Sequence, residues 1–136
     1  MNYISQAEFT LLVDSNFIFE TSPHIGLSIS GGADSMALLM LVKDWIRSKS
    51  GQITVFHFDH KIRKKSSKEA VWLKDYISKL GIKFHLLTWD RDEKLKLNME
   101  NARNARYERI LDVCKKLKII HLMTAHHFND NLETYY

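Results

Sequence analysis

The stretch Leu27–Val42, LSISGGADSMALLMLV, decides the fold. It continues an apolar run that starts at His24, passes through Ser-Gly-Gly, and then places apolar residues at helical spacing. This pattern predicts a strand, a tight turn and a helix in immediate succession. The two glycines allow positive φ and a close approach of the backbone to a ligand. The same turn contains a carboxylate, Asp34, which must be explained if the ligand is an anion.

The rest of the chain repeats the alternation of short apolar runs with helical periods. Continuous apolar strands in a βαβα order predict an α/β fold, a doubly wound, Rossmann-like parallel sheet in three α/β/α layers. No linker is evident, so we expect one domain that ends after its fourth strand. The predicted strands are His24–Ser30, Ile53–His60, Lys83–Asp90 and Ile119–His126. The predicted helices are about Ser5–Glu20, Ala33–Ser48, Ser67–Leu80 and Met99–Leu117, with a last one starting near Asn129.

Local capping signals agree with these boundaries. Ser66 and Glu69 have the spacing of a capping box at the start of the third helix. Gly51 and Gly81 follow the second and third helices, where a left-handed residue favours glycine. Asn98 is a suitable N-cap for the helix that starts at Met99.

Composition limits the class of protein. The chain has 136 residues, 45% hydrophobic and 26% charged, which is typical of one globular domain. Its single cysteine, Cys114, excludes a disulfide scaffold and a Cys-x-x-Cys pair within this chain. Neither a secretory signal nor an apolar run long enough to span a bilayer is present, so we expect a cytoplasmic protein with no membrane partner. The net charge of +4 is compatible with a nucleic-acid partner but does not demonstrate one.

The turn after the first strand has the features of a phosphate site. Backbone N–H groups from Gly32 to Ser35 would point at an anion from a helix N-terminus. The turn lacks the lysine of a Walker A loop and the third glycine of a dinucleotide fingerprint. A carboxylate beside phosphates is repulsive unless a cation lies between them, so Asp34 predicts bound Mg²⁺. The alternative is an ordinary strand-to-helix turn built from small residues.

A second polar cluster, TAHHFNDNLET, follows the fourth strand. If the strand order reverses between the first and fourth strands, Asp130 and Asp34 face each other across the crevice and could share that Mg²⁺. Glu133 would lie one turn further along the expected helix and could support Asp130. The alternatives are a helix-start carboxylate that complements the macrodipole and, for His126, a hydrogen-bonded imidazole.

Two arginines begin the helix Met99–Leu117. Arg103 and Arg106 lie on the face that becomes apolar from Ile110 onward, and an arginine on a core-facing stripe needs an anion. ATP phosphates would supply one, whereas salt bridges to acidic residues of the same helix are the alternative. Cys114 lies in the apolar part of this face and is expected to be inert.

The second strand ends with Phe56-His57-Phe58-Asp59-His60, next to the first strand. The backbone and side chains of this stretch, Phe58 among them, are placed to hold the adenosine part of a nucleotide. Because His57 and Phe58 alternate faces within a strand, at least one of them is expected to serve packing alone. The basic loop that follows could contact RNA phosphates, although a solvated loop is an equal alternative.

Taken together, these stretches resemble a known family. SGGADS resembles the pyrophosphate-binding loop of the N-type ATP pyrophosphatases, the PP-loop superfamily of adenine nucleotide alpha hydrolase type. FDHKIRKKSSKEA, NMENARNARYERI and TAHHFNDNLET resemble motifs of tRNA(Ile)-lysidine synthetase, in the same order and spacing. The resemblance covers most of residues 24–134.

The resemblance implies an ATP-dependent ligase that modifies tRNA. Enzymes of this family adenylate the C2 oxygen of the wobble cytidine in CAU-anticodon tRNA(Ile), and L-lysine then replaces AMP to form lysidine. By resemblance, Ser30, Gly31, Gly32, Ala33, Asp34 and Ser35 bind the ATP phosphates. Asp34 and Asp130 match the Mg²⁺ and catalytic positions, and His126 and Arg106 match residues at the reacting phosphate. Glu133 belongs to the last motif.

Two other functions compete with this interpretation. A tRNA thiolation enzyme of the same superfamily generally needs paired cysteines, and Cys114 stands alone. A non-catalytic ATP-binding module needs the phosphate turn but not Asp130, His126 and Arg106 together. Residues 1–136 would be the N-terminal portion of the catalytic domain, with downstream tRNA-recognition domains absent from the chain. A homodimer is compatible with the sequence, which does not decide the oligomeric state.

Overall fold

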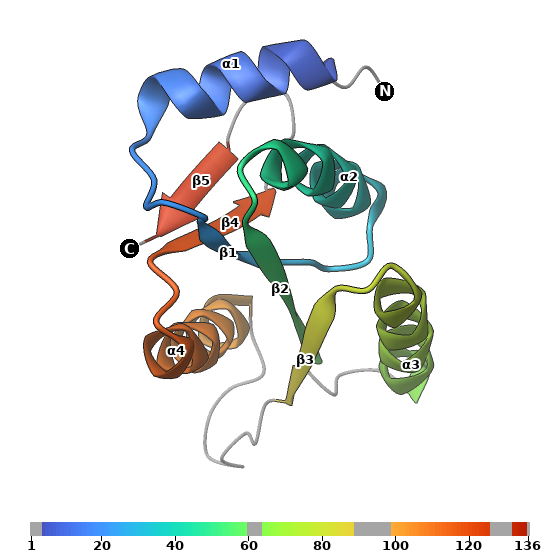
Figure 1. The fold of residues 1–136 in the computed structure, drawn as a ribbon. Helices are drawn as coiled ribbons and strands as arrows, with labels where there is room; N and C mark the ends of the chain where they lie inside the picture. Colours follow the sequence, from blue (N-terminus) through green and yellow to red (C-terminus); the bar gives the residue numbers. More distant parts are fainter. Residues whose placement is uncertain (1–3, 60–63, 89–98, 126–131, 136) are drawn as a thin grey trace.

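The computed structural model describes residues 4–59, 64–88, 99–125 and 132–135. Helices and strands alternate through most of these residues (Figure 1). The elements are α1 (Gln6–Asn16), β1 (His24–Ser28), α2 (Ala33–Ser48), β2 (Gln52–Asp59), α3 (Lys64–Lys79), β3 (Lys83–Thr88), α4 (Met99–Leu117), β4 (His121–Ala125) and β5 (Leu132–Tyr135).

The strands form one sheet in the order β3-β2-β1-β4-β5. β1 pairs in parallel with both β2 and β4, and β2 pairs in parallel with β3. The chain therefore moves outward from β1 in one direction through β2 and β3, and then returns to the other side of β1 through β4. This doubly wound parallel arrangement confirms the predicted fold class, with the strand order reversing at β1.

Helices cover both faces of the sheet, α2 and α3 on one face and α4 on the other (Figure 1). Alternate side chains of the central strands serve the two faces, as continuous apolar strands require. Ile25, Leu27 and Val55 belong to the core beneath α1, α2 and α3. Phe56 and Leu122 belong to the core beneath α4. The predicted three-layer architecture is confirmed.

Helix boundaries follow the predictions to different degrees. α2 and α4 have the predicted bounds. α1 begins after its N-cap, Ser5, whose hydroxyl accepts the N–H of Glu8 at 3.1 Å. It ends at Asn16 rather than near Glu20, because Phe17 and Phe19 continue as an extended segment packed on the core. Phe19 lies against the rings of Trp45 and His121, with centroid separations of 4.9 and 4.6 Å.

The predicted capping box at Ser66 is wrong. α3 begins at Lys64, so Ser66 lies inside the first helical turn and does not precede it. Asn98, the predicted N-cap of α4, lies outside the described residues.

The last predicted helix is also wrong at its described residues. Leu132–Tyr135 forms β5, which pairs antiparallel with β4. Without β5, β4 would leave the backbone N–H and C=O groups of one edge unpaired, and pairing satisfies them. Threonine and tyrosine near the end of the segment also favour a strand. The sheet therefore has a fifth strand that the sequence pattern did not indicate.

Three helices end on a residue with positive φ. Ser50, Gly81 and Lys118 have φ values of 53°, 75° and 59°. In each case the next residue donates its N–H to a carbonyl five residues earlier, the hydrogen bond of a Schellman motif. Gly81 thus has the predicted left-handed role. At the end of α2, however, Ser50 takes the left-handed conformation, and Gly51 is instead required because a β-carbon there would collide with the carbonyl oxygen of Pro23.

Candidate functional site

The turn between β1 and α2 is open on its outer side. Gly31 has φ 92°, and a β-carbon built on it would meet no heavy atom within 4 Å. Gly32 is the N-cap of α2 and makes no side-chain capping bond. Since the first N–H groups of a helix have no intrahelical acceptor, the turn presents donors next to free space. This is the local geometry that an anion site requires.

Two serine hydroxyls hold the turn in shape. The Ser35 hydroxyl donates to the Gly32 carbonyl at 3.0 Å and accepts the Gly31 N–H at 3.2 Å. The Ser30 hydroxyl lies 3.2 Å from that of Ser35 and accepts the Gly32 N–H at 3.2 Å. Because the Ser35 proton is committed to Gly32, the Ser30 hydroxyl donates to Ser35. Ser35 is 4% exposed, whereas Ser30, Gly31 and Gly32 are exposed, so a buried side chain supports an exposed turn.

Asp34 has an unsatisfied carboxylate oxygen. It lies in the first turn of α2, where the helix macrodipole favours a negative charge. Its Oδ1 atom is buried and accepts no hydrogen bond from any described residue. A buried carboxylate oxygen without a donor is costly, and a cation would satisfy it. Carboxylate oxygen is also the ligand type that Mg²⁺ prefers, so Asp34 fits the predicted metal role.

The other half of the predicted metal site, Asp130, lies outside the described residues, as does His126. Within the described part of the chain, no three His, Cys, Asp or Glu side chains lie close enough together to hold a metal ion. The predicted reversal of strand order is present, since β1 lies between β2 and β4. Ser28 pairs with Phe56 on one side and with Thr124 on the other.

Glu133 does not have the predicted helical position. It belongs to β5, and its backbone is in register with Thr124 of β4. The argument that Glu133 supports Asp130 from one helical turn away is therefore wrong, because no helix runs through Glu133.

The end of β2 contributes buried groups rather than an open side-chain pocket. Phe58 is 6% exposed and packs in the core beneath α4, which leaves its backbone as the part nearest the sheet edge. His57 is buried on the opposite face of β2, and its Nδ1 atom lies 2.8 Å from the Ile29 carbonyl. Because a carbonyl only accepts, Nδ1 carries the hydrogen. His57 thereby fixes the residue that precedes the Ser30–Ser35 turn, a positioning role that sequence patterns did not reveal.

The arginines of α4 lie on the other side of the sheet from α2 and flank one tyrosine. Arg106 is half-buried, and its Nε atom has no hydrogen-bond partner among the described residues. Its guanidinium carbon lies 4.7 Å from the centroid of the Tyr107 ring. Arg103 is exposed rather than core-facing, and its guanidinium carbon lies 5.3 Å from the same ring. Arg106 therefore has the unsatisfied donor that an anion-binding role requires, whereas Arg103 is held at the surface.

The predicted apolar stripe of α4 is only partly buried. Ile110 and Cys114 lie in the core, but Leu117 is exposed. Burial raises the pKa of the Cys114 thiol to about 11. Since the thiolate is the reactive form, Cys114 is inert at neutral pH, as expected.

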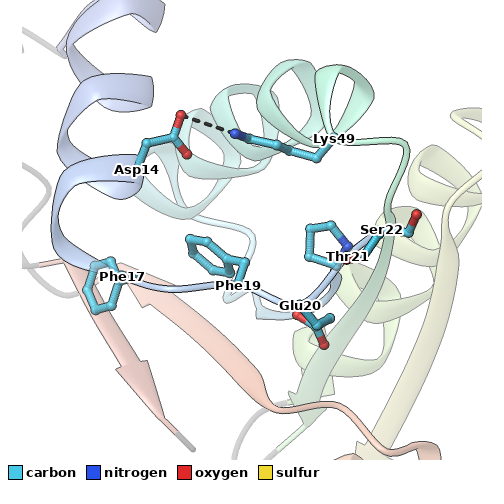
Figure 2. Close-up of a pocket in the computed structure, with 8 residues that line it drawn as sticks. Asp14, Phe17, Phe19, Glu20, Thr21, Ser22 and Lys49 are labelled. Carbon is cyan, nitrogen blue, oxygen red and sulfur yellow. Dashed lines mark hydrogen bonds and ion pairs between the residues drawn. The ribbon is translucent and has the colours of Figure 1, made fainter.

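A cavity of about 400 Å³ lies where β1 begins, at the end of the sheet away from the Ser30–Ser35 turn. Figure 2 shows the residues that line it. It is formed by the end of α1, the segment that leads into β1, and the end of α2. Asp14 bridges two of these parts by accepting from the Trp45 indole N–H at 3.0 Å and pairing with Lys49 at 3.3 Å. This cavity is separate from the crevice where parallel sheets bind ligands.

No helix in the described part of the chain is both long enough and apolar enough to cross a bilayer. The family described as PP-loop domain matches residues 1–136. Among curated proteins, the tRNA(Ile)-lysidine synthase of Orientia tsutsugamushi (strain Boryong) is 34% identical over 118 residues, which are 87% of this chain and 27% of that protein. The tRNA(Ile)-lysidine synthase of Rickettsia bellii (strain OSU 85-389) is 35% identical over 111 residues, 82% of this chain and 26% of that protein. The chain therefore spans about a quarter of the length of these relatives.

A solved structure has a similar fold. The U34-tRNA thiolase NcsA from Methanococcus maripaludis, with its [4Fe-4S] cluster, superimposes with a TM-score of 0.74. The match covers 89% of this chain and 44% of the thiolase, at 14% sequence identity. At that identity the likeness concerns the fold alone.

Proposed function

Because this chain belongs to the PP-loop domain family, we propose that it forms the ATP-binding part of a tRNA(Ile)-lysidine synthetase. In the proposed reaction, the C2 oxygen of the wobble cytidine attacks the α-phosphorus of ATP and releases pyrophosphate. The ε-amine of L-lysine then forms a bond to C2, and the C2–oxygen bond breaks to release AMP. The relatives with 32–35% identity support this assignment.

The observation that carries the proposal is the unsatisfied Asp34 oxygen in an open glycine turn. Gly31 and Gly32 leave room for phosphates beside the N-terminus of α2, and a carboxylate in that place would repel them. Asp34 would hold Mg²⁺, whose positive charge would offset the repulsion and satisfy the buried oxygen. The open turn and the buried carboxylate are thus explained by one ligand, metal-bound ATP.

The other roles in the proposal rest on family resemblance. The turn residues Ser30 to Ser35 would bind the phosphates, and Asp130 would share the metal with Asp34. Mg²⁺ would supply positive charge to the phosphates as negative charge develops there. Arg106 and His126 would contact the reacting phosphate, Arg103 would contact the nucleotide, and the backbone at Phe58 would face the adenosine.

We assign residues 1–136 to the N-terminal portion of the catalytic domain. Since the relatives are much longer, contacts to L-lysine and most contacts to the CAU-anticodon tRNA are proposed to lie outside this chain. A tRNA substrate is consistent with a cytoplasmic enzyme, and a homodimer is compatible with the proposal.

Two alternatives make different predictions. A tRNA thiolation enzyme would need a reactive cysteine, and Cys114 is buried with a pKa raised to about 11 by that burial. At 14% identity, the fold shared with a thiolase does not by itself favour this alternative. A non-catalytic ATP-binding module would tolerate Asp130→Asn, whereas a synthetase would lose adenylation.

The direct test is calorimetric titration of ATP into the chain with and without Mg²⁺. We expect binding that depends on Mg²⁺ and that weakens at least about tenfold in Asp34→Ala, since a charge-assisted metal contact is lost. Asp44→Ala is the matched control, because Asp44 is an exposed acid of the same helix beyond its first turn. It should bind ATP like the wild type.

Equal ATP binding by wild type and Asp34→Ala, or binding that is indifferent to Mg²⁺, would contradict the role of Asp34. Circular dichroism of each variant would establish that the chain is folded. If Asp34 has its proposed role, pyrophosphate release in the presence of the tRNA is the next measurement.

A further inference from the structure

The outward face of α3 carries two aromatic rings, of which Tyr76 packs partly against the core and Trp72 is exposed. Trp72 is 57% exposed, and its ring stacks on that of Tyr76 with a centroid separation of 5.5 Å and an interplanar angle of 14°. The inward face of the same helix is already filled, since Leu73 and Ile77 lie in the core. A stacked tryptophan left in water on the side away from the core therefore requires another explanation.

Lysines flank these rings along the helix. Lys68 lies one turn before Trp72 and Lys79 two turns after it, so the 3.6-residue period places all three on one side of α3. Both lysines are exposed. Lys79 Nζ lies 3.0 Å from Asp75 Oδ2, but both side chains are more than 60% exposed, so this ion pair is weak and exchangeable.

The whole helix is basic, with five lysines against two acidic residues. We use the name α3 outer face for Lys68, Trp72, Tyr76 and Lys79. It combines an aromatic platform with a lysine on each side, of which Lys79 pairs with Asp75. Protein–protein interfaces are depleted of lysine, whereas RNA-binding surfaces combine stacking rings with cations that contact phosphates.

We propose that the α3 outer face is a docking surface for RNA. An unpaired base stacks on Trp72, and the phosphates on either side contact Lys68 and Lys79. The inference rests on the proposed function only for the identity of the RNA as tRNA. The stacking platform and its charge do not depend on ATP or on the Ser30–Ser35 turn.

The position of α3 suits a substrate that must also reach the sheet edge. β2 ends at Asp59, at the same edge as the Ser30–Ser35 turn, and α3 begins at Lys64 (Figure 1). Trp72 lies about 12 Å further along the helix axis, at the rise of an α-helix. An RNA strand on the α3 outer face would therefore extend to the edge that binds the nucleotide.

The test measures binding of an unmodified CAU-anticodon tRNA(Ile) transcript by fluorescence anisotropy at several salt concentrations, without ATP. We expect Trp72→Ala to weaken binding about tenfold and Trp72→Phe, which keeps a ring for stacking, to retain most of the affinity. RNA should also quench tryptophan emission in the wild type, and Trp72→Phe should lose most of that quenching. Of the other two tryptophans, Trp45 is 1% exposed and cannot stack on a base. The quenching is measured in a Trp89→Phe background, so that the signal reports Trp72.

Two lysine variants provide a matched pair. Lys68 and Lys74 are both exposed residues of α3, but Lys74 comes two residues after Trp72 and therefore projects from the other side of the helix. Lys68→Ala should lower the affinity and reduce the salt dependence of binding, because one phosphate contact is lost. Lys74→Ala should leave both nearly unchanged.

Three results would overturn the inference: equal RNA affinity in Trp72→Ala and wild type, equal losses in the two lysine variants, or no RNA binding by a chain that binds ATP. Self-association that is lost in Trp72→Ala without a change in RNA binding would assign the face to a second copy instead. Calorimetric ATP titration of each variant separates the two proposals. RNA binding that depends on Trp72 in a chain that does not bind ATP would support the α3 outer face and contradict the proposed function.

Discussion

At the scale of single residues, Ser35 holds the Ser30–Ser35 turn together. Its hydroxyl donates to Gly32 and accepts from Gly31, and it also accepts from Ser30. Ser35→Ala removes these three hydrogen bonds at once, and of the two backbone groups only the Gly32 carbonyl keeps another partner, the Met36 N–H. We expect the free energy of unfolding to fall by about 1–3 kcal/mol. Urea denaturation followed by circular dichroism measures the change.

Ser48→Ala is the control for Ser35→Ala. Ser48 lies at the other end of α2, is exposed, and makes one hydrogen bond, to the Trp45 carbonyl at 2.7 Å. Its replacement should cost less than about 1 kcal/mol. Equal losses in the two variants would show that the Ser35 network contributes no more than a single surface hydrogen bond.

The conformation of the turn could be predicted from sequence, because the strand end, the glycines and the helix start lie within a few residues of one another. The buried Asp34 oxygen fits the predicted metal role for the same reason. The hydrogen bond from His57 to the Ile29 carbonyl could not be predicted, since it depends on the register between two strands. The exposed position of Arg103 was missed because helical periodicity does not define where a core-facing stripe ends.

At the scale of elements, the helix ends carry strain that glycine would remove. Lys118 adopts φ 59° at the end of α4, where an L-residue is disfavoured. Lys118→Gly keeps the Schellman hydrogen bond from Ile119 to Cys114 and relieves the strain. We expect the free energy of unfolding to rise by about 0.5–1 kcal/mol. This is the cost of the left-handed conformation for a residue with a β-carbon, minus the entropy that glycine loses on folding. Thermal denaturation would measure it as a higher Tm.

Gly81→Ala is the reverse change at the end of α3, where φ is 75° and space is open around the residue. Because no clash contributes, any loss of stability reports the backbone conformation alone. A loss here together with no gain in Lys118→Gly would mean that another contact of Lys118 offsets its strain.

Element types were predictable where a pattern extended over many residues, and not where it was short. α2 and α4 begin and end as predicted because each shows several turns of helical periodicity. Leu132–Tyr135 offers only four residues, and its pairing with the open edge of β4 decides its conformation. A strand formed by such long-range pairing leaves almost no signal in a short sequence window.

At the scale of the whole molecule, different features lie at the two ends of the parallel strands. The end of the sheet at which β1 and β4 end carries the Ser30–Ser35 turn, to which we assign ATP. At the opposite end, where the strands begin, α1 contacts α2. There Asp14 accepts a hydrogen bond from Trp45 and forms an ion pair with Lys49. A substitution at this second end can change the stability of the fold without altering the Ser30–Ser35 turn. A prediction about the pH dependence of stability can therefore be made there independently of function.

His24 begins β1 at this second end, and its Nε2 atom lies 2.7 Å from the Thr54 hydroxyl. Burial lowers the pKa of His24, the Lys83 cation lowers it further, and Glu20 opposes them. The unfolded chain therefore takes up the His24 proton near pH 6.5, before the folded chain does. This contribution to stability is complete above that pH and is lost as the pH falls through the lower pKa of the folded state.

We expect the free energy of unfolding, measured by urea denaturation between pH 7.5 and 5, to decrease with decreasing pH. In His24→Gln, which keeps a hydrogen-bonding side chain but does not titrate, the decrease should be smaller, by at most about 1.4 kcal/mol per pH unit for one proton. Lys83→Met should also reduce it, because removing the cation raises the pKa of His24 toward its ordinary value. A pH profile in His24→Gln identical to that of the wild type would show that His24 is protonated equally in both states, and that burial at the start of β1 does not exclude its charge.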